Sequence, residues 1–511
     1  MADTKREIER KFEFTRAPEK QGKRARRGVP DLTGTAAIAA VSDQGTVDLD
    51  AVYYDTPDQR LAADGLTLRR RTGGADAGWH LKLPVSPGVR DEIAAELSDS
   101  LPPSLAALVR SRVRGTGLEP QVRLVSSRRV SHLLDADGAL LAELSTDTVR
   151  AERGEDAAAW TEVEVELADG VDPALLDAVE KTFRKAGLRV SDAPSKLARA
   201  LTETGTAPPA RPAPDPGDGT AGAHVLAYLR EQRDALVALD PAVRRGLPDS
   251  VHQMRVASRR MRSAFKTYRK VLDRAATDPI GEELKLLAAE LGVDRDQEVL
   301  LERIQTHLGE LPRTLLLGPV RSRLRTWNTA RRSGSRRRAL AVLDTARHLA
   351  LLDSLDALLE NPPLLEAAAR PAEDVLPKAV LRDFERLAGR VGGALDLAPG
   401  EERDLALHEA RKAAKRARYA AEAAAPALGK PAKRLAKAMK SVQTLLGDHQ
   451  DSVVAREALR GLAVQAAGAG ESAFTWGVLY AREEALAERR ERELPDIWAE
   501  ASAPGLRAAL G

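Results

Sequence analysis

The first residues of the chain carry side chains that could hold a cation and an anion next to each other. In the run EIERKFEF, Glu7, Glu9 and Lys11 stand at alternate positions, and alternate side chains of a β-strand share one face. Hard divalent cations take oxygen ligands from carboxylates, whereas lysine and arginine neutralise phosphate groups. We therefore treat this face as a candidate site for binding a cation and an anion side by side.

The same alternation returns later in the chain. The run TEVEVEL places Glu162 and Glu164 on one predicted strand face, and basic residues alternate as Arg69 and Arg71 in LTLRRR and as Lys82 in WHLKLP. On an outward face, such residues would form ordinary solvated strands. In a closed ring of strands with its apolar faces outward, the charges would line an interior site. The pattern alone leaves both arrangements open.

The elements that must position these residues change in character along the chain. Short β-rich runs are predicted at 47–54, 66–71, 79–83, 140–144 and 160–167, and helices at 104–113 and 173–186. Residues 206–222 include a proline-rich segment without apolar periodicity, which is typical of a linker. Long Ala/Leu/Arg-rich segments with helical spacing follow. We therefore expect an α+β domain at 1–205, a linker at 206–222 and an all-α domain at 223–511.

Composition agrees with a folded multidomain protein. The 511 residues are 43% hydrophobic and 30% charged, and the chain has no cysteine, which excludes disulfides and thiolate metal sites. Residues 1–205 carry a net charge of −4 and residues 206–511 a net charge of +7. The charged N-terminal residues and the lack of a long apolar run predict a cytoplasmic protein without a membrane segment.

The ordered motifs EIERK, YYDTPDQRLAADGLTLRRR, WHLKLP, TEVEVEL and SKLARAL resemble the CYTH superfamily of triphosphate tunnel enzymes over about residues 5–202. The resemblance implies an antiparallel eight-stranded tunnel that holds a triphosphate and Mg²⁺ or Mn²⁺. It assigns metal binding to Glu7, Glu9, Glu162 and Glu164, with Glu7, Glu9 and Lys11 as the catalytic set. It assigns phosphate binding to Lys11, Arg69, Arg71, Lys82, Arg129 and Lys196, and it makes Glu92 and Glu166 further candidates for the lining.

One position departs from the CYTH pattern. Family members often carry an aspartate where this chain has Ser145. Asp147 follows two residues later at the same strand parity, so it is the expected replacement.

The helical half contains an internal repeat. The run VHQMRVASRRMRSAF at 251–265 matches LHEARKAAKRARYAA at 407–421, and LGVDRDQEVL at 291–300 matches LGDHQDSVVA at 446–455. Two motifs in the same order with nearly equal separations indicate two similar helical bundles that arose by duplication. Each copy has one cationic stripe on a helix face: His252, Arg255, Arg259 and Arg262 in the first, and His408, Arg411, Lys415 and Arg418 in the second.

These repeated motifs resemble the CHAD domain, the conserved histidine α-helical domain, over about residues 223–505. The resemblance implies that the two stripes bind polyphosphate. Arg260 and Arg416 are secondary candidates, and Tyr419, Glu422, Asp296 and Asp451 are expected to support the basic helices.

Together the two resemblances predict a metal-dependent hydrolase of inorganic triphosphate or short polyphosphate, with polyphosphate binding in the C-terminal half and a potential association with polyphosphate granules. Three alternatives remain: a non-catalytic polyphosphate-binding protein, a tunnel enzyme for an organic triphosphate such as thiamine triphosphate or ATP, and nucleic-acid binding. Aromatic residues make up 3% of the chain, so base stacking on the basic stripes has little support.

Overall fold

The computed structural model describes residues 3–15, 28–206, 219–332 and 335–510. The chain forms two compact units, Met1–Arg211 and Pro212–Gly511. Most of the expected linker, residues 207–218, lies outside the described residues, and the first helix of the second unit begins at Ala221, within the linker range expected from the sequence.

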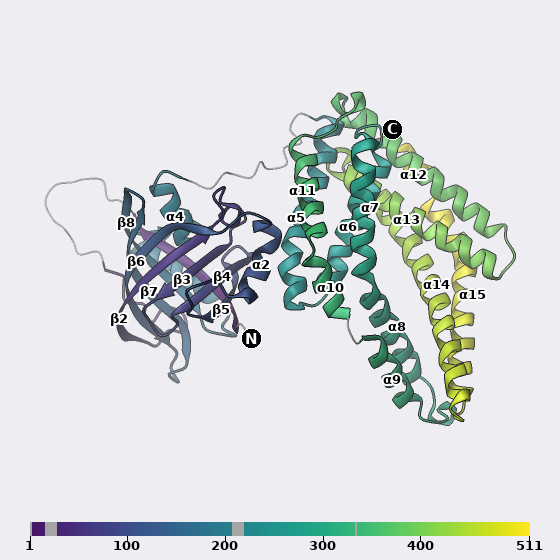
Figure 1. Ribbon diagram of the computed structural model, residues 1–511, viewed down its shortest axis with the longest axis horizontal. Helices are drawn as coiled ribbons and strands as arrows, with labels where there is room; N and C mark the ends of the chain where they lie inside the picture. The colour runs from purple at the N-terminus through teal and green to yellow at the C-terminus, as the bar shows by residue number, and fades with distance from the viewer. Residues whose placement is uncertain (1–2, 16–27, 207–218, 333–334, 511) are drawn as a thin grey trace. The chain divides into compact units, whose positions relative to one another are not determined.

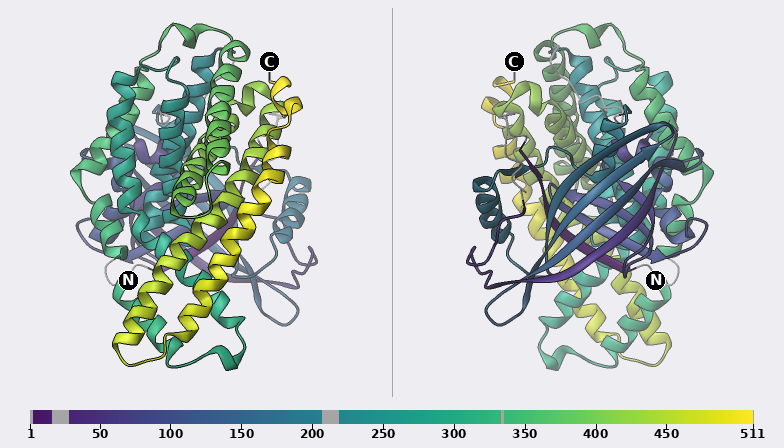
Figure 2. Two further views of the ribbon diagram at one scale, coloured as in Figure 1. Left: turned by 90° about the vertical axis from the view of Figure 1, so that its right-hand side faces the viewer. Right: turned by 90° about the vertical axis from the view of Figure 1, so that its left-hand side faces the viewer.

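Eight antiparallel strands of the first unit close into a ring (Figures 1 and 2). The order around the ring is β1-β5-β4-β3-β2-β6-β7-β8, and β8 pairs with β1 to complete it. The short β9 pairs with the end of β1. This arrangement confirms the predicted antiparallel eight-stranded architecture. The strands are β1 (Asp3–Phe14), β2 (Ala40–Asp55), β3 (Thr67–Thr72), β4 (Gly78–Ser86), β5 (Val89–Glu96), β6 (Glu119–Leu134), β7 (Leu140–Arg153), β8 (Asp156–Leu167) and β9 (Leu188–Val190).

Apolar side chains on the outside of the ring pack against short helices. The helices are α1 (Arg60–Ala63), α2 (Pro103–Val113), α3 (Ala174–Lys185) and α4 (Lys196–Glu203). Phe12 and Val163 of neighbouring strands join a core with Phe183 of α3, and the two phenylalanine rings meet edge to face at 4.7 Å. Because strand side chains alternate, burial of these residues outside the ring turns Lys11 and Glu164 inward. The charges therefore face the interior.

Helix α4 closes one end of this interior. Its apolar residues Leu197, Ala200 and Leu201 share a buried cluster with side chains such as Val149 and Trp160. These two residues are two positions from Asp147 and Glu162 on their strands, so they lie on the same inner face. The packing fills one end of the ring with apolar side chains and leaves the charged section beside it.

The second unit is all helical, as predicted. Its α-helices are α5 (Ala221–Arg245), α6 (Ser250–Thr267), α7 (Arg274–Glu290), α8 (Gly292–Gly309), α9 (Val320–Arg332), α10 (Ser335–Leu343), α11 (Ala346–Glu360), α12 (Ala372–Leu395), α13 (Glu401–Leu428), α14 (Lys430–Gly468), α15 (Phe474–Ala501) and α16 (Pro504–Ala508), with short 3₁₀ turns at Arg313–Leu315 and Glu366–Ala369. No helix among the described residues is both long and apolar enough to cross a membrane.

The sequence repeat corresponds to equivalent helices. Helix α6 matches α13, and the pair α7 and α8 matches the single long helix α14. The first copy is interrupted at Leu291, immediately before the repeated glycine, whereas the second copy continues through that glycine. The repeated motifs therefore occupy equivalent helical positions in both halves.

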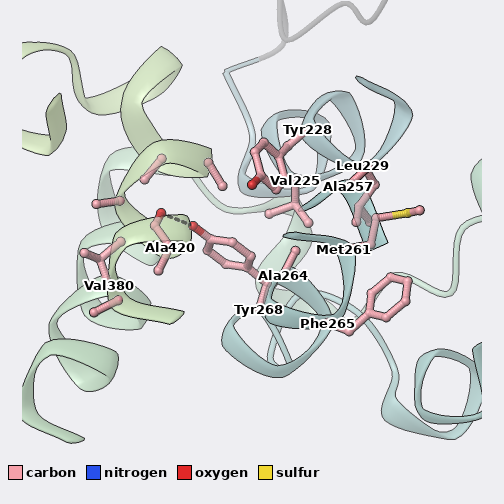
Figure 3. Close-up of a cluster of buried hydrophobic side chains, with 14 of the residues drawn as sticks. Val225, Tyr228, Leu229, Ala257, Met261, Ala264, Phe265, Tyr268, Val380 and Ala420 are labelled. Atoms are coloured by element: carbon pink, nitrogen blue, oxygen red, sulfur yellow. Dashed lines mark hydrogen bonds between the residues drawn. The ribbon is translucent and has the colours of Figure 1, made fainter. Parts of the chain in front are cut away.

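The two repeats share one hydrophobic core. Met254 and Met261 of α6 belong to the same buried cluster as Ala417 and Ala420 of α13. Figure 3 shows Tyr268 in this cluster, where its hydroxyl donates a hydrogen bond of 2.8 Å to the carbonyl oxygen of Ala420. The common core holds α6 and α13 together, so it also determines how the charged side chains on their other faces lie relative to one another.

Candidate functional site

The ring of the first unit encloses a cavity of about 410 Å³. Strands from all around the ring and the start of α4 contribute charged side chains to its wall. Among these are Lys5, Glu7, Glu9, Lys11, Arg69, Arg71, Lys82, Glu92, Arg128, Glu164, Glu166 and Lys196. The cavity thus combines the acidic and basic residues that the sequence singled out.

Three carboxylates form a buried group at one side of the interior. Asp147 on β7 lies opposite Glu162 on β8, and Glu164 follows on the same face of β8. One oxygen from each side chain lies within 4.8 Å of the others. Lys196 brings its Nζ to 2.9 Å from Asp147, 2.7 Å from Glu162 and 2.5 Å from Glu164. The three negative charges therefore surround one ammonium group.

The donor set of this group fits a divalent cation. All three ligands are carboxylates, the oxygen donors that Mg²⁺ and Mn²⁺ accept. Glu162 Oε1 and Glu164 Oε1 are buried and accept no hydrogen bond of good geometry from the described residues, although ammonium groups lie near them. A cation at this position would complete the coordination of both oxygens. The chemistry of the residues does not distinguish Mg²⁺ from Mn²⁺.

Lys196 reaches the carboxylates because α4 begins at that residue. Ser195 caps the helix: its Oγ accepts a hydrogen bond of 3.0 Å from the backbone N–H of Ala198. The apolar face of α4 then anchors in the end of the ring. Despite burial, the charges of Glu164 and Asp147 raise the pKa of Lys196, so the side chain stays cationic.

A second charged sector lies on β1, β3, β4 and β5. Lys82 Nζ donates to Glu7 Oε2 at 2.6 Å, and His80 Nδ1 lies 2.9 Å from Glu92 Oε1. Arg69 donates to the hydroxyl of Tyr53 at 3.3 Å. Arg71 pairs with Asp76. Several cationic groups therefore face the cavity close to one another.

Electrostatic strain is concentrated at two of these residues. Burial raises the pKa of Glu7 to about 7, in spite of the neighbouring Lys82. Burial and the positive charges of Arg69 and Arg128 lower the pKa of Arg71 to about 10. A polyanion in the cavity would relieve the repulsion among the arginines.

The structure distributes the four predicted metal ligands over two places. Glu162 and Glu164 belong to the three-carboxylate group. Glu7 and Glu9 line the cavity but are paired with lysines, Glu7 with Lys82 and Glu9 with Lys11 at 3.2 Å. Asp147 lies with Glu162 and Glu164 in the carboxylate group, and its role as the replacement for an aspartate at position 145 stays a prediction.

Arg129 does not line the cavity. Its side chain is 65% exposed and pairs with Asp43 at 2.7 Å. Arg128 faces inward instead, donating two 2.8 Å hydrogen bonds to Asp147 and one of 3.1 Å to Glu164. Because adjacent residues of a strand point to opposite faces, only one of the two arginines can reach the interior. The other predicted phosphate contacts, Lys11, Arg69, Arg71, Lys82 and Lys196, all line the cavity.

In the second unit, the two predicted stripes come together between α6 and α13. Lys415 on α13 is affected by the charges of its neighbour Arg411 and of Arg259 and Arg255 on α6. Burial and these positive charges lower the pKa of Lys415 to about 7, and Asp451 opposes the effect. We call these five residues, with the backbone that supports them, the α6–α13 surface.

The remaining stripe residues differ in how they are held. His408 Nδ1 lies 2.6 Å from Gln450, and Arg418 donates to Glu422 at 2.6 Å. His252 is half-buried on α6, and burial lowers the pKa of Arg262. Among the expected supporting residues, Tyr419 is buried, with the guanidinium groups of Arg260 and Arg418 over its ring at 5.7 and 5.6 Å. The side chain of Asp296 lies outside the described residues.

A second group of potential metal ligands occurs in the helical unit. His449 Nε2 lies 3.3 Å from both Asp404 and Glu491. Arg456 pairs with Asp404 at 2.7 Å, and Arg403 with Glu491 at 2.9 Å. The two arginines already neutralise the two carboxylates, so the group is explained as an ion-pair network that joins α13, α14 and α15.

Two protein-family models match the chain. The model of the CYTH domain matches residues 5–201, and that of the CHAD domain matches residues 227–460. Proteins from two strains of Mycobacterium tuberculosis, both named as uncharacterised, are 39% identical to the chain over 516 residues, covering 96% of this chain and 94% of theirs.

Solved structures also show similarity. PptA from Streptomyces chartreusis matches with a TM-score of 0.46 and 23% identity, covering 55% of this chain and 99% of its own. The CHAD domain from the plant Ricinus communis matches with a TM-score of 0.43 and 26% identity, covering 56% of this chain and 93% of its own. From the two family models and the relatives that match it over nearly their full length, the chain belongs to the family of proteins that join a CYTH domain to a CHAD domain.

Proposed function

We propose that the first unit hydrolyses inorganic triphosphate or short polyphosphate with the aid of a divalent cation, and that the second unit binds polyphosphate. The observation that carries the first part is one cavity whose wall joins a cationic sector to Glu164, a member of the buried three-carboxylate group. A triphosphate bound to a divalent cation presents both charge signs, so it matches both parts of the wall.

In this proposal the cationic residues bind and orient the substrate. Arg69 and Arg71 project from one face of β3, so their guanidinium groups can hold adjacent phosphate groups. Lys82 and Lys11 now pair with Glu7 and Glu9, and they can exchange these partners for phosphate oxygens. Arg128 contacts Asp147 and Glu164, and its positive charge also acts on Arg71 of the cationic sector, so it can bridge the two parts of the wall.

Asp147, Glu162 and Glu164 would hold the cation. Bound there, a divalent cation would neutralise phosphate charge and polarise a phosphoryl oxygen. Two of the carboxylates stay ionised for this role: despite burial, the charges of Lys11 and Lys196 lower the pKa of Glu164, and those of Lys196 and Arg128 lower the pKa of Asp147. Lys196 shares these oxygens and would be displaced toward the phosphates when a cation is present.

An inorganic substrate agrees best with the lining. Tyr53 and His80 are the aromatic side chains among the described lining residues, and both are engaged by charged neighbours. An adenine or thiazolium ring would need an open apolar or aromatic surface for stacking. Binding without turnover is the second candidate, because Lys196 and Arg128 already occupy the carboxylates that a cation requires.

The α6–α13 surface supports the second part of the proposal. Four cationic side chains from two helices act on one another there, and burial together with the charges of the three arginines lowers the pKa of Lys415 to about 7. Such crowding is unfavourable until an anion is bound. A polyphosphate chain supplies repeated negative charges and releases its condensed counterions upon binding, as nucleic-acid backbones do.

The test is phosphate release from tripolyphosphate by the full-length protein, with Mg²⁺, with Mn²⁺ and in EDTA. We expect turnover that requires a divalent cation and falls at least about a hundredfold in the double variant Glu162→Gln/Glu164→Gln, which removes two ligands. Full activity in EDTA would contradict metal dependence. Binding of tripolyphosphate without release would establish the second candidate, and faster turnover of thiamine triphosphate or ATP would change the substrate class.

A further inference from the structure

The repeat places a glycine against an arginine twice. Gly292, the first residue of α8, lies against Arg255 of α6, and Gly447 in α14 lies against Arg411 of α13. Both glycines are buried. They come from the second repeated motif, LGVDRD and LGDHQD, while the arginines come from the first. The duplication has therefore kept the contact between its two motifs in both copies.

The first contact is much tighter than the second. A Cβ atom added at Gly292 would lie 2.8 Å from Nη2 of Arg255, 3.0 Å from Cζ and 3.3 Å from Nε. The same addition at Gly447 would lie 3.5 Å from Nη2 of Arg411 and 3.6 Å from Nε, which is ordinary van der Waals separation. Only at the first position would an added methyl group displace the arginine.

A hydrogen bond also fixes the first pair. Arg255 Nη1 donates to the carbonyl oxygen of Gly292 at 3.3 Å. With a methyl group at residue 292, the guanidinium would have to move off this part of the backbone. The guanidinium is the far end of a flexible side chain, so it can move without a shift of α8. Helix packing would survive, and the position of the charge would change.

That charge belongs to the α6–α13 surface. Arg255 contributes to the positive potential at Lys415, together with Arg259 and Arg411. From these contacts we propose that Gly292 is a positioning residue for polyanion binding, because its missing side chain lets Arg255 lie flat against α8 with its charge in the surface. The inference rests on polyphosphate binding by the second unit and names the residue that shapes that site in the first repeat.

The experiment compares Gly292→Ala with the matched variant Gly447→Ala in the full-length protein. Binding of polyphosphate of defined length is measured by titration calorimetry in EDTA, and folding is checked by circular dichroism and thermal unfolding. We expect Gly292→Ala to weaken binding by about threefold to tenfold, the effect of weakening one charge-assisted contact. Gly447→Ala should bind within twofold of the original protein.

Two further variants distinguish positioning from general damage. Arg255→Gln should weaken binding at least as much as Gly292→Ala, and Gly292→Ala should have no further effect in the Arg255→Gln background. Additive losses, equal effects of the two glycine variants, or unchanged binding by Gly292→Ala would each overturn the inference. If the original protein itself does not bind polyphosphate, the proposed function fails instead, so the two failures are distinct.

Discussion

At the scale of single residues, the side chains that line the cavity depend on which of two adjacent strand residues points into the ring. Arg128 and Arg129 are adjacent and chemically identical, yet one bonds to Asp147 and Glu164 while the other pairs with Asp43 on the outside. Because adjacent residues of a strand face opposite sides, only Arg128 of this pair lines the cavity. Local environment likewise distinguishes Lys415 from the other lysines of its helix.

The two arginines provide a matched test. We expect Arg128→Gln to lower kcat/KM for tripolyphosphate by about tenfold to a hundredfold, because one charge-assisted phosphate contact is lost. Arg129→Gln should remain within twofold, since its side chain is 65% exposed. Steady-state phosphate release measures both. A larger loss in Arg129→Gln than in Arg128→Gln would mean that the inward assignment is wrong.

Lys415 predicts a pH dependence of polyphosphate binding. Its pKa of about 7 lies below the ordinary lysine value because of burial and the charges of Arg411, Arg259 and Arg255, with Asp451 of α14 acting in the opposite direction. A bound polyanion favours the protonated form, so affinity should rise as pH falls from 9 to 6, with uptake of a proton. Calorimetry in buffers of different ionisation enthalpy measures that uptake.

Two variants test whether Lys415 causes the pH dependence of binding. Lys415→Arg stays charged throughout the range and should flatten the pH profile, whereas Lys412→Arg, at an exposed position on the same helix, should keep it. The free energy of unfolding should depend on pH in the direction opposite to that of the binding affinity. Unfolded Lys415 holds its proton up to about pH 10.4, so stability should rise between pH 7 and that value, where only the unfolded chain binds the proton. If Lys415→Arg leaves the pH profile of binding unaltered, the assignment of this profile to Lys415 is wrong.

At the scale of elements, α4 determines what occupies the carboxylate group. The helix is anchored by Leu197, Ala200 and Leu201, and its first residue, Lys196, inserts an ammonium group among three carboxylates. A divalent cation bound to this group, as proposed, would compete with the lysine for the same oxygens. The element that closes the ring would then also set the affinity for the cation.

We therefore expect Lys196→Gln to gain more thermal stability from Mn²⁺ than the original protein does, because the carboxylates lose their internal cation. Unfolding temperature, measured with and without Mn²⁺ and in the absence of phosphate, reports this directly. Lys185→Gln, at an exposed position on α3, serves as the control. An equal Mn²⁺ effect in all three proteins would show that Lys196 does not compete with the cation.

At the scale of the whole molecule, the two units have separate cores and separate charged sites. Within the second unit, duplication has produced one shared core, and it brings the two stripes to the same surface. In the proposed function, a long polyphosphate would contact both stripes at once, and each contact would raise the effective concentration of the chain at the other. The length of the ligand should therefore determine its affinity.

Neutralising one stripe tests this arrangement. Both Arg255→Gln/Arg259→Gln and Arg411→Gln/Lys415→Gln should weaken long-chain polyphosphate at least tenfold, with a far smaller effect on tripolyphosphate, and the combination should add little. Calorimetry gives both affinity and stoichiometry. If each pair of substitutions instead halves the stoichiometry and leaves the remaining affinity unchanged, the stripes are two independent sites.

The sequence by itself determined the division into a β-rich and a helical part, the duplication, and most of the charged residues that line the cavity and form the α6–α13 surface. Alternation identified the stripe of Glu162 and Glu164, and helical spacing identified those on α6 and α13, because local periodicity places side chains on one face. The predicted strands at 47–54, 79–83, 140–144 and 160–167 lie within β2, β4, β7 and β8, and the one at 66–71 begins one residue before β3. Strand β6, which carries Arg128 and Arg129, was not foreseen as a strand.

The tertiary structure decided what depends on contacts between distant segments. Which arginine of β6 faces inward follows from its register with β7, where Arg128 lies opposite Asp147. The grouping of Asp147 with Glu162 and Glu164, the insertion of Lys196 among them, and the contact of Gly292 with Arg255 likewise join residues that are far apart in sequence. Periodicity reports the face of one element, whereas the partner of that face is set by packing across the whole fold.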